Sequence, residues 1–267
     1  MKEQLYRIKT ALLYGVSSFV TGISGEMDDS IKAISAYKNK YKGQSCFVIG
    51  NGPSLLPEDL DKLNEKKIIT FASNKVYKIF DKTAWRPTFY AMVDESVADD
   101  ECIKQNNNFS CEAKFFRRQG WYVYRKIKGA IYMNSWHSRK YLEVPNFSEE
   151  LSEGVYTIAT VTYVLLQMAR YMGFSKIYLL GMDNRYKFGM DRKGQVYRNK
   201  DVLSYFGEQD SDEEMPKIAP AIWELDLAYE YADKYSREHG FRIYNSTRGG
   251  FLEKFERVQF DEVINNL

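Results

Sequence analysis

Ser-Cys-Phe-Val-Ile-Gly-Asn-Gly-Pro-Ser occupies residues 45–54 and joins a short apolar run to an abrupt polar turn. The apolar residues 46–49 predict a buried strand, and Leu-Leu-Pro-Glu-Asp-Leu at 55–60 is typical of a helix start. Such a turn presents backbone N–H groups and a helix N-terminus to whatever lies above the sheet. Its spacing is neither GxxxxGK[ST] nor GxGxxG, so it fits a plain turn and a phosphate site equally well.

Apolar runs and helical periodicities alternate along the rest of the chain, which predicts an α/β fold with a mostly parallel sheet and helices on both faces. Further strands are expected at 68–72, 89–93, 121–124, 130–133, 177–180 and 241–244. Helices are expected at 57–64, 154–172, 222–238 and 261–265, with residues 96–120 helical and irregular. The polar segment at about 184–220 shows no clear periodicity, which is typical of a lid or binding loop.

Hydrogen-bonding residues follow five of the predicted strands. Ligands of parallel sheets bind outside the carboxyl ends of the strands, so these residues are candidates for one shared site. The residues are Asn51 and Ser54, Ser73 and Asn74, Asp94, Asp183, and Asn245, Ser246 and Thr247. Asp94 and Asp183 fit a metal ligand, a ribose acceptor, a catalytic base or a helix cap. Thr157, near the start of a predicted helix, fits a phosphate contact or a cap.

Composition excludes several classes of function. The net charge of +2 without a basic block argues against nucleic acid as a partner. Cys46, Cys102 and Cys111 form no CxxC pair, which indicates neither a disulfide framework nor a zinc site and favours a reducing, cytoplasmic location. The chain has two histidines, His137 and His239, too few for a histidine-rich metal site.

Residues 1–43 are predicted to be a helical lead-in to the domain at 44–267. Its apolar residues recur at helical spacing, and its runs are too short and interrupted to span a bilayer. They are Leu5, Ile8, Leu12, Val16, Phe19 and Val20. Three environments fit this amphipathic pattern: packing on the domain, peripheral contact with the inner face of the membrane, and pairing in a homo-oligomer.

Four motifs occur in the order of a known superfamily, at residues 47–55, 86–94, 172–183 and 245–250. The set resembles the 6-hydroxymethylpterin pyrophosphokinase-like domains and the motility-associated-factor glycosyltransferases. It is also similar to bacterial CMP-sialic acid sialyltransferases, which share the GNGPS turn, an Asn after the second strand and a Gly-x-Asp strand end. The resemblance covers roughly residues 44–265 and implies a Rossmann-like, nucleotide-binding sheet.

The resemblance implies a donor-binding role for the individual residues that match the family's motifs. The GNGPS turn and the following Asn contact a CMP-sugar in the sialyltransferase-like branch, a helix start lies beside the cytidine, and tyrosines after the Gly-x-Asp strand bind phosphate. Tyr186 is offset by one residue from that tyrosine position, and Tyr197 is a looser match. With the anion-binding turn at 247–250 added, the candidate donor-binding residues are Gly50, Asn51, Gly52, Pro53, Ser54, Asn74, Gly154, Thr157, Tyr186 and Thr247.

The sialyltransferases use a lid His as general base, and residues 184–220 contain none. The acids that can take that role are Asp183, Glu208, Asp210 and Asp212, with Asp94 as a further catalytic candidate. The sequence therefore predicts a glycosyltransferase of surface-glycan biosynthesis. It would transfer a CMP-linked acidic sugar to a glycan or lipid-linked acceptor and require no metal.

Two other functions remain open at this stage. One is transfer of diphosphate from ATP to a pterin-like alcohol, with Mg²⁺ held by Asp94 and Asp183. The other is a non-catalytic subunit that binds a nucleotide-sugar.

Overall fold

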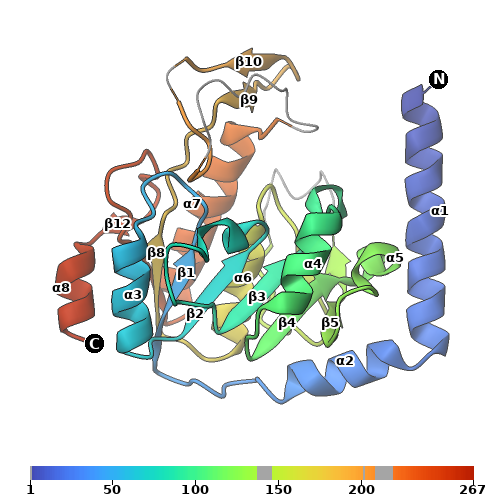
Figure 1. The fold of residues 1–267 in the computed structure, drawn as a ribbon, viewed down its shortest axis with the longest axis horizontal. Coiled ribbons are helices and arrows are strands. Elements are labelled where there is room, and N and C mark those ends of the chain that lie inside the picture. Colours follow the sequence, from blue (N-terminus) through green and yellow to red (C-terminus); the bar gives the residue numbers. More distant parts are fainter. Residues whose placement is uncertain (1, 137–145, 201, 208–218) are drawn as a thin grey trace.

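The structure is a computed structural model that describes residues 2–136, 146–200, 202–207 and 219–267. Within these ranges, eight strands form one sheet in the order β12-β11-β8-β1-β2-β3-β4-β5, and every neighbouring pair is parallel (Figure 1). The α/β fold predicted from the sequence is therefore confirmed.

The strands of the main sheet are β1 Ser45–Ile49, β2 Thr70–Ser73, β3 Phe89–Met92, β4 Ala113–Arg117, β5 Ala130–Met133, β8 Lys176–Leu180, β11 Arg242–Asn245 and β12 Glu256–Arg257. Two small sheets pair β6 Ser135–Trp136 with β7 Val155–Tyr156, and β9 Phe188–Met190 with β10 Val196–Arg198. The α-helices are α1 Lys2–Ile23, α2 Glu26–Ser35, α3 Pro57–Glu65, α4 Asp100–Asn108, α5 Trp121–Tyr124, α6 Val161–Tyr171, α7 Ile222–Glu238 and α8 Phe260–Asn265. Three 3₁₀ turns are η1 Val76–Ile79, η2 Glu95–Val97 and η3 Arg118–Gly120.

Both faces of the sheet are buried, as continuous apolar strands require. Alternate residues of β1 enter two separate cores: Cys46 and Val48 belong to one, and Phe47 and Ile49 to the other. Helices α6 and α7 contribute to the first core, and α3, α4 and α8 to the second. The expected helices on both faces are confirmed.

Several predicted elements differ from those observed. Residues 121–124, predicted as a strand, form helix α5, because they continue the turn of η3, where the Tyr124 ring packs directly over Gly120. Strand β4 lies inside the segment predicted as helical and irregular. Its second residue, Lys114, is buried and donates to the carbonyl of Phe109 at 2.7 Å, so a charged residue interrupts the apolar pattern. Strand β12 is two residues long and was not predicted.

The helix predicted at 154–172 begins only at Val161. Thr160 caps it by accepting from the Thr162 N–H at 3.2 Å, while Val155 and Tyr156 form β7. The segment at 184–220, predicted without structure, carries the β9–β10 hairpin. In Figure 1 this hairpin lies above the carboxyl ends of the strands.

Helix α1 stands along one edge of the molecule and packs through its polar side (Figure 1). Ser17 and Thr21 are fully buried, and Arg118 Nε donates to Thr21 Oγ1 at 2.6 Å. Three residues of the apolar stripe identified in the sequence instead face outward: Leu12 and Phe19 are about two-thirds exposed, and Val16 about half. In the part of the chain that the structure describes, no helix combines the length and apolar character needed to cross a membrane.

Candidate functional site

The sheet reverses its winding direction between β1 and β8. From β1 the chain adds β2, β3, β4 and β5 on one side, and then places β8, β11 and β12 on the other. In open α/β sheets, ligands bind in the crevice at this point, outside the carboxyl ends of the two diverging strands. The loops that leave β1 and β8 here begin at Gly50 and Gly181.

The polar strand ends predicted from the sequence lie in one continuous row. They follow β11, β8, β1, β2 and β3, which are consecutive in the sheet. The row is therefore centred on the switch point.

Gly50 and Gly52 bring the two diverging loops into backbone contact. The Gly50 N–H donates to the carbonyl of Leu180 at 2.7 Å, and the Gly52 N–H to that of Gly181 at 2.9 Å. A Cβ on Gly50 would lie 2.2 Å from the Gly181 oxygen. Glycine is required at this position for close approach of two backbones.

Asp183 anchors the turn at 50–54 from the β8 side. Its Oδ2 accepts from Ser54 Oγ at 2.7 Å and from the Ser54 N–H at 3.3 Å. Burial raises the pKa of the Asp183 carboxyl, and the Ser54 hydrogen bonds oppose that shift. A Cβ on Gly52 would lie 1.8 Å from the same oxygen.

Most backbone N–H groups of the turn already donate hydrogen bonds within the protein. The N–H groups of Gly50, Gly52 and Ser54 bond to the end of β8, and Pro53 has none. The turn is therefore not the open cradle of N–H groups that a P-loop offers to phosphate. Within the described ranges, Asn51 Oδ1 at this turn has no hydrogen-bond partner.

Asn51 and Asn74 present unpaired acceptors beside this turn. Asn51 Nδ2 donates to the Ser73 carbonyl at 3.2 Å, and this fixes the orientation of its amide. The Oδ1 atoms of Asn51 and Asn74 are both buried and have no hydrogen-bond partner among the described residues. A buried unpaired amide oxygen is costly unless a ligand donates to it, so these atoms fit ribose hydroxyls or the amino group of a base.

Two asparagines at the strand ends also adopt strained backbone. Asn74 has φ 52° and Asn184 has φ 51°, in the left-handed region. The carbonyl of Asn74 is held by the Tyr90 hydroxyl at 2.7 Å, and the side chain of Asn184 donates to Asp226 at 3.0 Å. Non-glycine residues in this conformation cluster at binding sites because the surrounding structure imposes it.

A pocket of about 190 Å³ opens next to the turn. Its lining residues are Pro53, Asp183, Arg185, Val202, Leu203, Gly250 and Phe251. The Arg185 guanidinium lies 4.6 Å from the centre of the Phe251 ring. Arg185 forms no ion pair within the described ranges, so it is a pre-oriented cation available to an anionic ligand. Sequence reasoning missed Arg185 and Phe251, although Arg185 follows the Gly-x-Asp motif by two residues.

Thr247 and Arg248 stabilise the site through contacts with the end of β8 and with helices α3 and α8. Thr247 Oγ1 accepts from the Met182 N–H at 3.0 Å and so fixes the end of β8. Arg248 binds Asp59 and Asp261, each at 2.9 Å. Its guanidinium is engaged on α3 and α8, so this turn supplies no free cation.

The structure places Gly154 and Thr157 at the β6–β7 sheet rather than in the first turn of a helix. Gly154 precedes β7, and the Thr157 N–H donates to the Trp136 carbonyl at 3.1 Å. The N-terminus of α6 is instead at Thr160. There Thr162 Oγ1 donates to Met182 Sδ at 3.6 Å, so the helix start adjoins the end of β8.

Tyr186 lies between the switch point and the hairpin. Burial raises the pKa of its hydroxyl well above the usual value, so it is a neutral donor at physiological pH. Asn199 donates to its carbonyl at 2.8 Å. Residues 202–207 also contact the turn at 50–54, because the Phe206 N–H donates to the Asn51 carbonyl at 3.0 Å.

Asp94 is at the end of β3, exposed, and caps η2 by accepting from the Ser96 N–H at 2.9 Å. Strands β1 and β2 separate β3 from β8, so the ends that carry Asp94 and Asp183 are about 14 Å apart. One Mg²⁺, with bonds of about 2 Å, does not bridge them. Among the described residues, no group of three or more His, Cys, Asp or Glu side chains is placed to hold a metal. Asp210, Glu208, Asp212 and His137 lie outside the described residues.

Comparison with known proteins gives the family. Residues 25–189 match the family model described as 6-hydroxymethylpterin diphosphokinase MptE-like, which is more than half of the chain. The chain belongs to this family. No curated protein gave a significant sequence match.

The fold of this MptE-like chain is similar to a solved glycosyltransferase. The structure of the MAf glycosyltransferase from Magnetospirillum magneticum AMB-1 aligns with a TM-score of 0.50 at 15% identity. The alignment covers 88% of this chain and 38% of that one, so the chain spans well under half the length of its structural neighbour. The expected relationship to the 6-hydroxymethylpterin pyrophosphokinase-like domains is confirmed, and the MAf glycosyltransferase shares the fold. The similarity to sialyltransferases stays a prediction.

Proposed function

We propose that this MptE-like protein is a glycosyltransferase whose nucleotide-activated sugar binds at the β1–β8 switch point. The observation that carries the proposal is the pair of buried, unpaired Oδ1 atoms of Asn51 and Asn74 beside the glycine turn. They are acceptors, and the nucleoside part of a donor offers the N–H and O–H groups that satisfy them.

The donor we propose is a CMP-linked acidic sugar. Such a donor carries one phosphate and one sugar carboxylate, and Arg185 is a stacked cation without an ion-pair partner among the described residues, at the mouth of the adjoining pocket. Because this leaving group has a single phosphate, the reaction needs no metal. The acceptor, a glycan or a lipid-linked glycan, would enter from the side of the β9–β10 hairpin.

The reaction is an inverting transfer. The bond between the anomeric carbon and the phosphate oxygen breaks, the acceptor oxygen bonds to that carbon, and the acceptor proton passes to a base. The leaving CMP phosphate would be stabilised by Arg185 and the neutral hydroxyl of Tyr186. Asp183 is our candidate base: burial raises the pKa of its carboxyl, which favours proton uptake, and its Oδ1 is not used by Ser54.

Diphosphate transfer from ATP to a pterin-like alcohol is the second candidate, favoured by the description of the family model. It requires Mg²⁺, and the separation of Asp94 from Asp183 means that other groups would have to hold the ion.

The two reactions release different products. We expect CMP release from a CMP-linked acidic sugar, unaffected by EDTA and lost in Arg185→Ala. Arg192→Ala is the matched control, because Arg192 also stacks on an aromatic ring, that of Trp223 at 5.4 Å, but does not line the pocket. Release of AMP from ATP with a pterin alcohol, abolished by EDTA, would replace the proposal with the second candidate.

A further inference from the structure

Helix α1 carries an exposed apolar seam with the period of a coiled coil. Leu12, Val16, Phe19 and Ile23 follow one another at intervals of four, three and four residues, which are positions d, a, d and a of a heptad. Their exposed fractions are 66%, 52%, 67% and 70%. Leu12 and Phe19 are seven residues apart, as are Val16 and Ile23, and a seven-residue repeat keeps such a seam facing one partner helix in a supercoiled pair.

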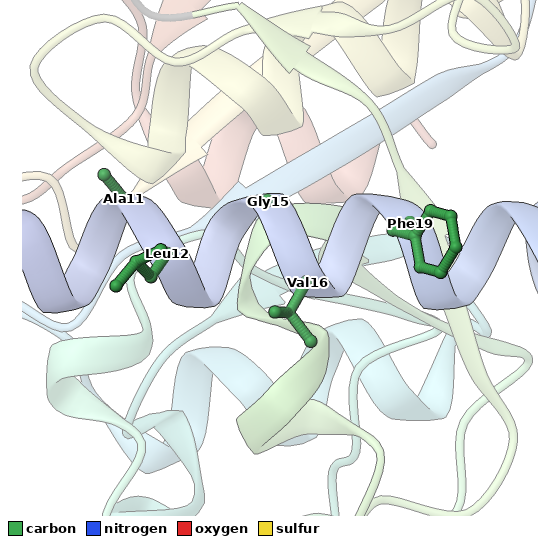
Figure 2. Close-up of a pocket in the computed structure, with 5 residues that line it drawn as sticks. All are labelled: Ala11, Leu12, Gly15, Val16 and Phe19. Atoms are coloured by element: carbon green, nitrogen blue, oxygen red, sulfur yellow. The ribbon is translucent and has the colours of Figure 1, made fainter.

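The other side of α1 is already committed to the domain. Tyr14 accepts from Arg117 Nη2 at 2.6 Å and also bonds to Glu95, while Ser17 and Thr21 are fully buried. Rotating the helix to bury the seam would break these contacts. Figure 2 shows Leu12, Val16 and Phe19 of the seam on α1, where a shallow hollow is lined by Ala11, Leu12, Gly15, Val16 and Phe19, all from α1 itself.

We propose that α1 pairs with α1 of a second copy of this chain as a parallel, two-stranded coiled coil. Val16 and Ile23 occupy a positions and Leu12 a d position, the combination that favours two strands. Beside the seam, a Cβ built on Gly15 would have nothing within 4 Å, so a second helix has room to approach.

Charge and area favour a second copy over a lipid surface. The charged residues of α1, Lys2, Glu3, Arg7 and Lys9, all precede the seam, and residues 10–25 contain no Asp, Glu, Lys or Arg. Helices that bind anionic membranes instead carry Lys and Arg along the polar face that flanks their apolar stripe. An uncharged seam meets its own copy without repulsion. The four side chains expose on the order of 400 Å² per protomer. Pairing along a helix about 33 Å long would add their flanks and reach the smaller end of stable interfaces.

Light scattering coupled to size exclusion tests the proposal on the full chain. We expect twice the chain mass of 31.2 kDa for the wild type and 31.2 kDa for Phe19→Glu. Leu267→Glu, at another exposed apolar residue, should remain dimeric. An unchanged melting temperature in Phe19→Glu would show that the domain remains folded.

Crosslinking tests the register. Oxidised Phe19→Cys should form a disulfide-linked dimer, because d positions meet across a parallel pair, whereas Asp28→Cys on the exposed side of α2 should not. A monomeric wild type overturns the proposal. So does a monomer that floats with phosphatidylglycerol vesicles and loses this binding in Phe19→Glu, which would assign the seam to a membrane.

Discussion

At the scale of single residues, Gly52 has a structural role in the turn, whereas its neighbour Asn51 has the role that we assign to ligand binding. Its missing side chain makes space for the Asp183 carboxylate, which in turn holds Ser54. The neighbouring Asn51 is oriented by its hydrogen bond to the Ser73 carbonyl, and its unpaired oxygen is the group we assign to the nucleoside. The turn is therefore built by its glycines and would bind through its asparagine.

Gly52→Ala should destabilise the protein by about 2 kcal/mol or more, because the new Cβ overlaps Asp183. Urea unfolding measures this loss. Asp183→Ala should lower the unfolding free energy less in the Gly52→Ala background than in the wild type, because removing the carboxylate relieves the overlap. Strictly additive losses would show that the two residues do not oppose each other.

Comparing the wild type with Asp183→Asn should reveal the raised pKa of Asp183 as a difference in how the unfolding free energy depends on pH. The native carboxyl holds its proton to a higher pH than the unfolded one, whose pKa is near 3.8. The native state therefore binds more protons in this range, and stability falls as pH rises from about 3.8 through the native pKa. The unfolding free energy of the wild type minus that of Asp183→Asn should fall over this interval. A flat or rising difference would contradict the assignment.

At the scale of elements, helix α1 is attached to the domain through Tyr14 and a mostly buried ion pair. Glu95 and Arg117 are a mostly buried ion pair, and Tyr14 on α1 bonds to both. Burial and the Glu95 hydrogen bond raise the pKa of the Tyr14 hydroxyl, so the hydroxyl remains a donor.

Glu95→Ala should cost about 3 kcal/mol in a urea titration, because it leaves the Arg117 guanidinium buried without its carboxylate. Glu256→Ala, which removes an exposed partner of Arg242, should cost less than about 1 kcal/mol. Equal losses in the two variants would show that the Glu95 pair is not effectively buried.

Elements with a clean apolar pattern were predictable from sequence, and elements whose pattern depends on tertiary contacts were not. Helix α7 was predicted with its observed bounds, and β1 within one residue. Strand β4 was missed because the buried Lys114 is satisfied by carbonyls of the preceding segment. The Asn51 and Asn74 candidates came from strand-end polarity, whereas Arg185 emerged only when Phe251, distant in sequence, was found beneath it.

At the scale of the whole molecule, the proposed binding site and the α1 seam lie along different edges. The sheet reverses at β1 and β8, and the five polar strand ends lie along that edge. Helix α1 lies along another edge of the molecule, beyond β4 and β5 in Figure 1, and the side chains of its seam are exposed. Binding at the switch point and pairing through α1 therefore use separate surfaces and are testable separately.

Calorimetric titration with CMP, CDP, ATP and GTP tests whether a cytidine nucleotide binds at the switch point. We predict that the wild type binds CMP and CDP more tightly than the purine nucleotides. Asn74→Ala should weaken CMP at least tenfold, because it removes the acceptor assigned to the nucleoside, and each tenfold step is about 1.4 kcal/mol. Equal affinity for all four nucleotides, or CMP binding unchanged in Asn74→Ala, would contradict the claim.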